Sequence, residues 1–296
     1  MFEGFSQRTV DTGEARIFLR EGGTGRPLLL LHGFPQTHLM WRDIAPLLAR
    51  DFTVVCPDLR GYGASSCPAS TASHAPYSKR AMGGDMVRVM AHLGFEKFAI
   101  AGHDRGGRVA YRLAMDAPGN VTRVAVLDVV PTEVAWAHAD ARFAIGYWPW
   151  TLLAQPTPLP ERILVEAAAE VVDNALETWG PQLRSTPAAV REAYASALQD
   201  PAHAHAICEE YRAAAGLDRE HDQADAASGR RIAAPLLALW SSKGPLDIWY
   251  AAQSGPLALW RQYAADVQGY AIEGGHFFPE QNPEATLSGL RSFLQE

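Results

Sequence analysis

The stretch that decides the fold is Gly102-His103-Asp104-Arg105-Gly106-Gly107. It follows an apolar run, 98–101, and precedes a segment, 108–114, whose apolar residues have helical spacing. A strand, a tight turn and a helix are therefore predicted in succession, with Asp104 at the tip of the turn. So sharp a turn needs glycines, because it leaves little room for side chains against the adjoining strand and helix. A carboxylate at the tip can displace a leaving group from an alkyl carbon and become an ester.

The composition indicates a globular enzyme of 296 residues, with 48% hydrophobic and 20% charged residues. A formal charge of -7 argues against a nucleic-acid partner. The chain has no basic-then-apolar start and no long uncharged apolar stretch, so we expect neither a signal peptide nor a membrane partner. The cysteines are odd in number and lack the spacing of a disulfide framework, which favours a cytoplasmic location for the protein. They are Cys56, Cys67 and Cys208.

Short apolar runs alternate with helical patterns along most of the chain. We expect an α/β fold, a mostly parallel twisted sheet with helices on both faces. Residues 15–19 alternate weakly and are expected to form an edge strand. The other strands are predicted at 27–31, 53–56, 98–101, 123–128, 235–240 and 268–272, and the helices of this unit at 41–49, 77–93, 108–114 and 283–294.

The pattern changes after Pro131. From Thr132 to about Gln223 the chain is rich in alanine, tryptophan and charge at helical spacing, without a clear strand. We interpret 132–223 as an inserted helical cap, with 1–131 and 224–296 forming the core domain. His203, His205 and Cys208 lie in this insert at a spacing that fits no standard metal-ligand pattern, so we expect an exposed cap helix there and no metal. No cofactor motif is present.

Three chemically active residues follow predicted strands: Asp104, Asp128 and His276. Open α/β sheets place their ligand sites at these carboxyl ends. The order nucleophile, acid, histidine is that of the α/β-hydrolase fold. We expect His276 to act as general base and Asp128 to orient it. Asp247 is the alternative acid; Asp128 is favoured because it ends its strand directly.

Backbone donors and two arginines complete the expected site. The loop after strand 27–31 would supply the N–H of Phe34 to an oxyanion hole, with the N–H of Arg105 as the second donor. Arg105 and Arg108 follow Asp104 closely, and a buried guanidinium binds a carboxylate with two hydrogen bonds. They predict a small anionic substrate and keep Asp104 ionised.

These motifs resemble the haloacetate dehalogenases of the α/β-hydrolase superfamily, which include the fluoroacetate dehalogenases. The resemblance extends nearly end to end, and Asp-Arg at the turn, in place of the Asp-Trp common in epoxide hydrolases, makes it specific. It is carried by 32–36, 58–63, 102–108, 127–132, 209–214 and 274–278. It implies Asp104 as nucleophile, Asp128 and His276 as the rest of a triad, and Arg105 and Arg108 as the ligands of the substrate carboxylate. It also implies Trp150 and Tyr211 at the leaving halide, and a homodimer.

The chain departs from the family pattern at one halide-site position. The fluoroacetate enzymes have a histidine between tryptophans, whereas this chain has Pro149, which has neither a side-chain donor nor a backbone N–H. Fluoride needs strong hydrogen bonds as it leaves, so we expect the preference to shift toward chloride and bromide. His138 could substitute for the histidine, although nothing in the sequence places it there. Trp148 and Trp179 are expected to be packing residues.

Two other functions stay open. An epoxide hydrolase would share Asp104 and His276 and use Tyr147 and Tyr211 to protonate the epoxide, but the two arginines would then have no purpose. A homologue that binds a ligand without turning it over is the second, since Pro149 removes a donor from an otherwise intact set.

Overall fold

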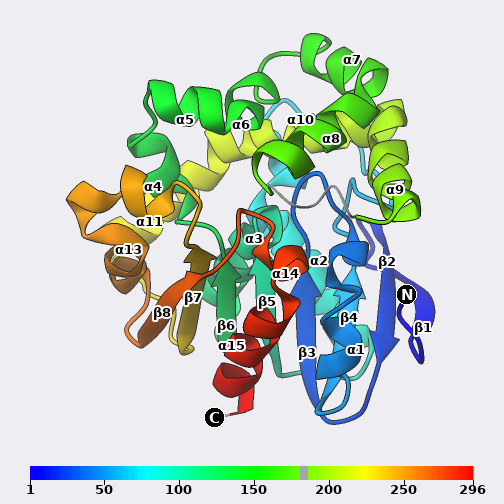
Figure 1. Ribbon diagram of the computed structural model, residues 1–296, viewed down its shortest axis with the longest axis vertical. Helices are drawn as coiled ribbons and strands as arrows, with labels where there is room; N and C mark the ends of the chain where they lie inside the picture. The colour runs from blue at the N-terminus through cyan, green and yellow to red at the C-terminus, as the bar shows by residue number, and fades with distance from the viewer. Residues whose placement is uncertain (181–185, 296) are drawn as a thin grey trace.

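The computed structural model describes residues 1–180 and 186–295. Within these residues eight strands form one sheet in the order β1-β2-β4-β3-β5-β6-β7-β8 (Figure 1). The pairs β1–β2 and β2–β4 are antiparallel, and all other neighbours are parallel. The strands are β1 (Ser6–Asp11), β2 (Arg16–Gly22), β3 (Arg26–Leu31), β4 (Phe52–Pro57), β5 (Phe98–His103), β6 (Val121–Leu127), β7 (Leu236–Ser241) and β8 (Val267–Ile272).

The leucine run of β3 shows why the sheet is buried on both faces. Leu29 and Leu31 belong to the core that includes the residues of α2 and α3, whereas Leu28 and Leu30 belong to the core under α1 and α15. A continuous apolar run is therefore needed, because successive side chains point to opposite faces. The predicted mostly parallel α/β sheet is confirmed.

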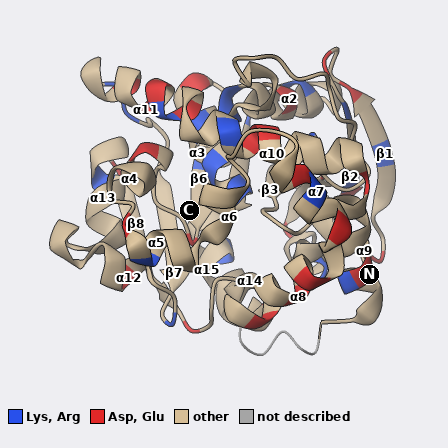
Figure 2. Ribbon diagram, turned by 90° about the horizontal axis from the view of Figure 1, so that it is seen from above, with Lys and Arg blue, Asp and Glu red and all other residues tan. Residues whose placement is uncertain are grey.

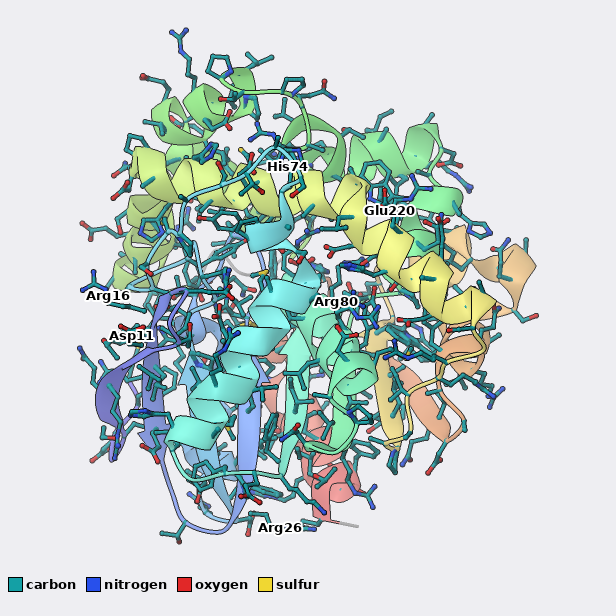
Figure 3. The ribbon with its side chains drawn as sticks, turned by 180° about the vertical axis from the view of Figure 1, so that it is seen from behind. Asp11, Arg16, Arg26, His74, Arg80 and Glu220 are labelled. Carbon is teal, nitrogen blue, oxygen red and sulfur yellow. The ribbon has the colours of Figure 1, made fainter. Side chains whose placement is uncertain are left out.

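Helices cover the two faces of the sheet. The rear face carries α2 (Lys79–His92) and α3 (Arg105–Asp116), which Figure 3 shows from behind with Arg80 of α2 labelled. The front face carries α1 (Ala45–Leu48), α14 (Phe278–Gln281) and α15 (Pro283–Gln295) (Figure 1). Shorter elements complete this unit: η1 (His38–Trp41), η2 (Ala75–Tyr77), α12 (Leu246–Trp249), η4 (Ala251–Gln253) and α13 (Gly255–Tyr263).

Two expectations about elements of this unit were wrong. Residues 15–19 are not at the edge, because β1 pairs with the outer side of β2. The sequence of β1, Ser-Gln-Arg-Thr-Val-Asp, is polar and mostly exposed, so it carries no apolar signal. The helix expected over 41–49 is only the four residues of α1, preceded by the 3-10 turn η1.

The described residues between β6 and β7 are mostly helical, and their helices lie over the carboxyl ends of the strands (Figure 1). They are α4 (Thr132–Ala137), α5 (Ala141–Gly146), α6 (Trp148–Leu152), α7 (Leu159–Glu166), α8 (Ala168–Thr178), α9 (Ala188–Gln199), α10 (Pro201–Ala215) and α11 (Leu217–Ala227). The division into a core and a cap domain stays a prediction; α11 continues to Ala227, past the expected boundary at 223.

Helix α10 is not the exposed helix that we expected around His203 and Cys208. Most of it is buried, and Cys208 is fully buried with a pKa raised by that burial. His203 faces the carbonyl of Gly61, and His205 lies within 3.3 Å of Glu161. The described residues contain no cluster suited to a metal ion, and no helix among them is long and apolar enough to cross a membrane.

Candidate active site

Asp104 is held at the tip of the turn between β5 and α3 with φ 48° and ψ -118°. Neighbouring glycines make this geometry possible. A Cβ on Gly102 would lie 2.2 Å from the carbonyl oxygen of Gly106, and one on Gly106 would lie 2.4 Å from that of His32. A Cβ on Gly33 would meet Asp104 itself, at 2.4 Å. The turn therefore packs directly against the loop that follows β3.

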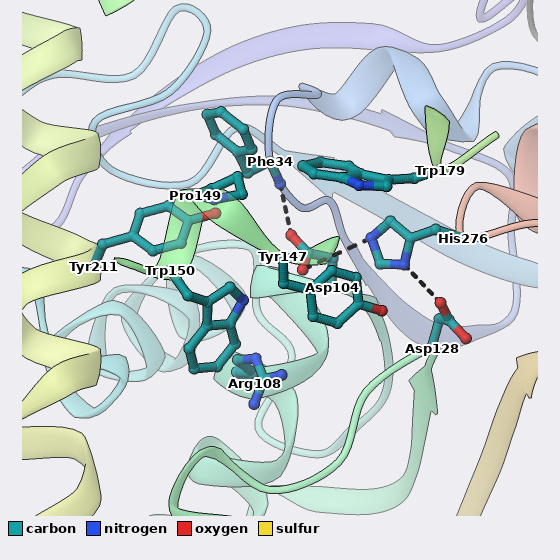
Figure 4. Close-up of a pocket in the computed structure, with 10 residues that line it drawn as sticks. All are labelled: Phe34, Asp104, Arg108, Asp128, Tyr147, Pro149, Trp150, Trp179, Tyr211 and His276. Atoms are coloured by element: carbon teal, nitrogen blue, oxygen red, sulfur yellow. Dashed lines mark hydrogen bonds and ion pairs between the residues drawn. The ribbon is translucent and has the colours of Figure 1, made fainter. Parts of the chain in front are cut away.

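The carboxylate of Asp104 is fixed by the backbone of that loop. The N–H of Phe34 donates to Oδ1 at 2.8 Å, and Nε2 of His276 lies 3.8 Å from Oδ2 (Figure 4). Burial alone would raise the pKa of Asp104, but the charges of His276 and Arg105 and the Phe34 N–H lower it below its ordinary value. Asp104 is thus available as an anion.

His276 follows β8 and is oriented by Asp128 at the end of β6. Its Nδ1 lies 2.6 Å from Oδ2 of Asp128, whose Oδ1 accepts the N–H of Ser241 at 2.8 Å. Burial would lower the pKa of His276, but the hydrogen bond and charge of Asp128 outweigh it and raise that pKa. The structure does not bring Asp247 to this site: its carboxylate is exposed and accepts the indole N–H of Trp240.

The two arginines differ, although the sequence presents them as a pair. Arg105 donates through Nε to Oε1 of Glu210 at 2.8 Å. Arg108 donates through Nη1 to the carbonyl of Val130 at 2.7 Å, and no carboxylate among the described residues lies within 4.0 Å of it. Nη1 of Arg105 and Nε of Arg108 are buried without a hydrogen-bond partner in the described part of the chain.

Aromatic rings support both guanidinium groups. Arg108 lies 4.3 Å from the ring centroid of Trp150, and Arg105 lies 4.0 Å from that of Tyr211. Contacts of this kind are favourable when the cation is desolvated. The charged groups and the rings thus form one packed unit beside Asp104.

A small cavity of about 20 Å³ lies between Asp104, Arg108 and the aromatic rings (Figure 4). His276 and Asp128 lie on one side of Asp104, and Trp150 and Tyr211 lie on the other. The lining residues are Phe34, Asp104, Arg108, Asp128, Tyr147, Pro149, Trp150, Trp179, Tyr211 and His276.

The chain is similar to known proteins over its whole length. The α/β hydrolase fold model matches residues 26–283. Fluoroacetate dehalogenase from Burkholderia sp. is 42% identical, over 100% of this chain and 96% of its own length. The chain belongs to the haloacetate dehalogenase family of α/β-hydrolases. A putative α/β hydrolase from Nostoc sp. PCC 7120 superimposes with a TM-score of 0.96 at 47% identity, covering 100% of both chains.

This haloacetate dehalogenase family member is also similar to epoxide hydrolases. Soluble epoxide hydrolase from Corynebacterium sp. (strain C12) is 31% identical, over 94% of this chain and 93% of its own length. Family membership therefore establishes a hydrolase of this fold, and the bond that it cleaves has to be argued from the site.

Most residues that we predicted for the site of this dehalogenase family member do meet in the cavity. Arg105 is the exception: it is not among the lining residues, and Glu210 binds its Nε and Nη2, although its guanidinium lies against the ring of Tyr211, which does line the cavity. Its backbone N–H starts α3 and has no partner within that helix. His138 lies elsewhere, with Nδ1 at the carbonyl of Val134, so it does not replace the histidine missing at Pro149.

One lining residue of the cavity was missed from the sequence, and another, Tyr147, was considered only for epoxide hydrolysis. Trp179, expected to be a packing residue, lines the cavity and accepts the backbone N–H of His276 at 2.6 Å through its carbonyl. Tyr147 places a buried hydroxyl there that lacks a partner among the described residues. Trp148 does not line the cavity, and its indole donates to Asn174.

Proposed function

We propose that this hydrolase releases halide from small 2-haloacids, converting haloacetate to a hydroxy acid. The observation that carries the proposal is Arg108, a buried guanidinium without a carboxylate partner among the described residues, in the same cavity as Asp104. A buried cation of this kind calls for an anion. A cavity of about 20 Å³ has room for little more than one water molecule, so it favours the smallest substrates.

In the first step, Oδ2 of Asp104 attacks the carbon that bears the halogen, and the carbon–halogen bond breaks as the ester forms. Arg108 and the unpaired Nη1 of Arg105 hold the substrate carboxylate, which aligns the carbon with the nucleophile. Attack from behind sends the halide away from Asp104, toward Trp150 and Tyr211.

In the second step, water attacks the carbonyl carbon of the Asp104 ester while His276 takes its proton. The backbone N–H groups of Phe34 and Arg105 stabilise the oxyanion. His276 returns the proton to the departing alkoxide, and the hydroxy acid leaves. A single turnover in ¹⁸O water should therefore label Asp104; label in the first product would exclude the ester.

Pro149 sets the expected halide preference. It lines the cavity without offering a hydrogen-bond donor. Losing one donor to the charge that develops in a transition state costs roughly a hundredfold in rate. Fluoride depends on such donors more than chloride or bromide does. Chloroacetate and bromoacetate should be turned over faster than fluoroacetate.

The test is halide release from fluoro-, chloro- and bromoacetate, with Asp104→Asn as the blank. Release that disappears in the variant supports the proposal, and a strong preference for fluoride would contradict the argument from Pro149. If no haloacetate reacts, the proposal fails.

Epoxide hydrolysis is the second candidate, because the hydroxyl-bearing Tyr147 and Tyr211 both line the cavity and Tyr147 Oη has no partner among the described residues. A small terminal epoxide assayed beside the haloacetates separates the two. Ligand-induced thermal stabilisation without any product would instead indicate the non-catalytic homologue. The cytoplasmic location and the homodimer stay predictions, to be checked by fractionation and sedimentation.

A further inference from the structure

Glu210 of α10 is fully buried between this helix and the loops at the carboxyl ends of the strands. Its Oε1 accepts Nζ of Lys79 at 2.5 Å and Nε of Arg105 at 2.8 Å. Its Oε2 accepts the hydroxyl of Tyr62 at 2.5 Å. The partners begin α2 (Lys79), begin α3 (Arg105) and belong to the loop after β4 (Tyr62). Figure 2 shows the basic residues of α3 beside the acidic residues of α10.

Such a buried ionic cluster is a poor way to gain stability. Taking each ion out of water is costly, and well-packed apolar residues often stabilise a protein as well or better. Burial would raise the pKa of Glu210, but Arg105 and Lys79 lower it to about 2. The carboxylate therefore stays charged, and its position points to a role at the guanidinium that it binds.

One side-chain nitrogen of Arg105, Nη1, is bound by none of the described residues. The Glu210 carboxylate accepts a hydrogen bond from Nε, and the Glu210 backbone carbonyl accepts one from Nη2 at 3.4 Å. The next residue, Tyr211, covers the guanidinium face. Only Nη1 is buried without a partner among the described residues, so one turn of α10 holds Arg105 by its far edge and its face and leaves Nη1 unpaired.

We propose that Glu210 is a positioning residue that acts through Arg105, holding its Nη1 in place for the carboxylate of the substrate. This inference rests on the proposed function and extends it to a residue that does not line the cavity. It makes Arg108 the uncompensated charge that attracts the anion and Arg105 the group whose placement Glu210 sets.

The test is a double-mutant cycle read out by glycolate binding in calorimetry, which needs no turnover. Glu210→Gln should weaken glycolate binding at least about tenfold, since it releases a charge-assisted hydrogen bond that places Arg105. In an Arg105→Ala background the same change should alter binding less than about twofold, because the residue through which it acts is gone. Haloacetate kinetics should show the loss mainly in KM.

Two further variants keep the test sharp. Lys79→Met with Glu210→Gln removes a cation together with the anion, so it avoids leaving an extra buried charge, and it should weaken glycolate binding as Glu210→Gln does. Glu161→Gln disrupts the Arg212 ion pair in the same group of helices, away from the cavity, and should leave binding unchanged. Equal losses in both Arg105 backgrounds, or no loss in either, would overturn the role of Glu210. Wild-type protein that neither binds glycolate nor releases halide would instead overturn the proposed function.

Discussion

His276 should govern the pH dependence of turnover. A general base must be neutral, and Asp128 raises the pKa of His276 above its ordinary value despite burial. Activity should therefore be lost as the pH falls through that raised pKa. Asp128→Asn should move this acid limb of kcat/KM to lower pH and reduce kcat by at least about a hundredfold.

Asp247→Asn is the matched control for that prediction. Asp247 follows β7, as Asp128 follows β6, and it was the rival acid. Its carboxylate instead binds Trp240 at the surface. Asp247→Asn should leave the acid limb of kcat/KM at the wild-type pH and leave kcat unchanged. A shifted limb in Asp247→Asn with none in Asp128→Asn would reverse the assignment.

Single residues were predictable where the fold itself places them. Asp104, Asp128 and His276 each follow a strand, and parallel strands bring their carboxyl ends to one edge of the sheet. Trp179 and Glu210 follow no such rule. Their positions depend on how helices from distant parts of the chain pack, which helical spacing does not reveal.

Among the elements, the turn from β5 to α3 should tolerate the least change. Gly106→Ala forces a Cβ to within 2.4 Å of the carbonyl oxygen of His32, where backbone would have to move. We expect a loss of more than about 3 kcal/mol in the free energy of unfolding, measured with denaturant. Gly119→Ala is the control, since a Cβ there meets nothing within 4 Å. Equal stability of the two variants would contradict the steric account.

The elements that were predicted well carry strong apolar patterns. β3, β4, β6 and β7 all lie inside the sheet, and their buried runs were visible in the sequence. β1 was missed because a polar edge strand has almost no pattern. The burial of α10 was missed for a different reason: its many alanines fit a buried helix and an exposed one equally well.

At the scale of the whole molecule, Asp222 joins three helices. This buried residue of α11 accepts the hydroxyl of Tyr111 in α3 at 2.8 Å and the N–H of Glu133 in α4 at 3.1 Å. Burial raises its pKa to about 6, above that of an unfolded aspartate. The folded state thus binds the proton more tightly, so Asp222 makes stability fall as the pH rises from about 4 to about 6.

Asp222→Asn should remove that fall, which amounts to at most about 1.4 kcal/mol per pH unit. Denaturant unfolding of variant and wild type across this range gives the difference in free energy. It should change steadily in favour of the variant up to about pH 6 and then level off. A difference that is constant with pH would show that Asp222 has no raised pKa.

The hydrogen bond from Phe34 to Oδ1 of Asp104 gives the two oxygens of one side chain different lifetimes. With Oδ1 anchored, the proposed attack uses Oδ2, and each cycle sends that atom out in the product and replaces it from water. Oδ1 stays with the protein for as long as the protein lasts. After many turnovers in ¹⁸O water, Asp104 should carry one heavy oxygen, and a second would mean that the carboxylate rotates between cycles.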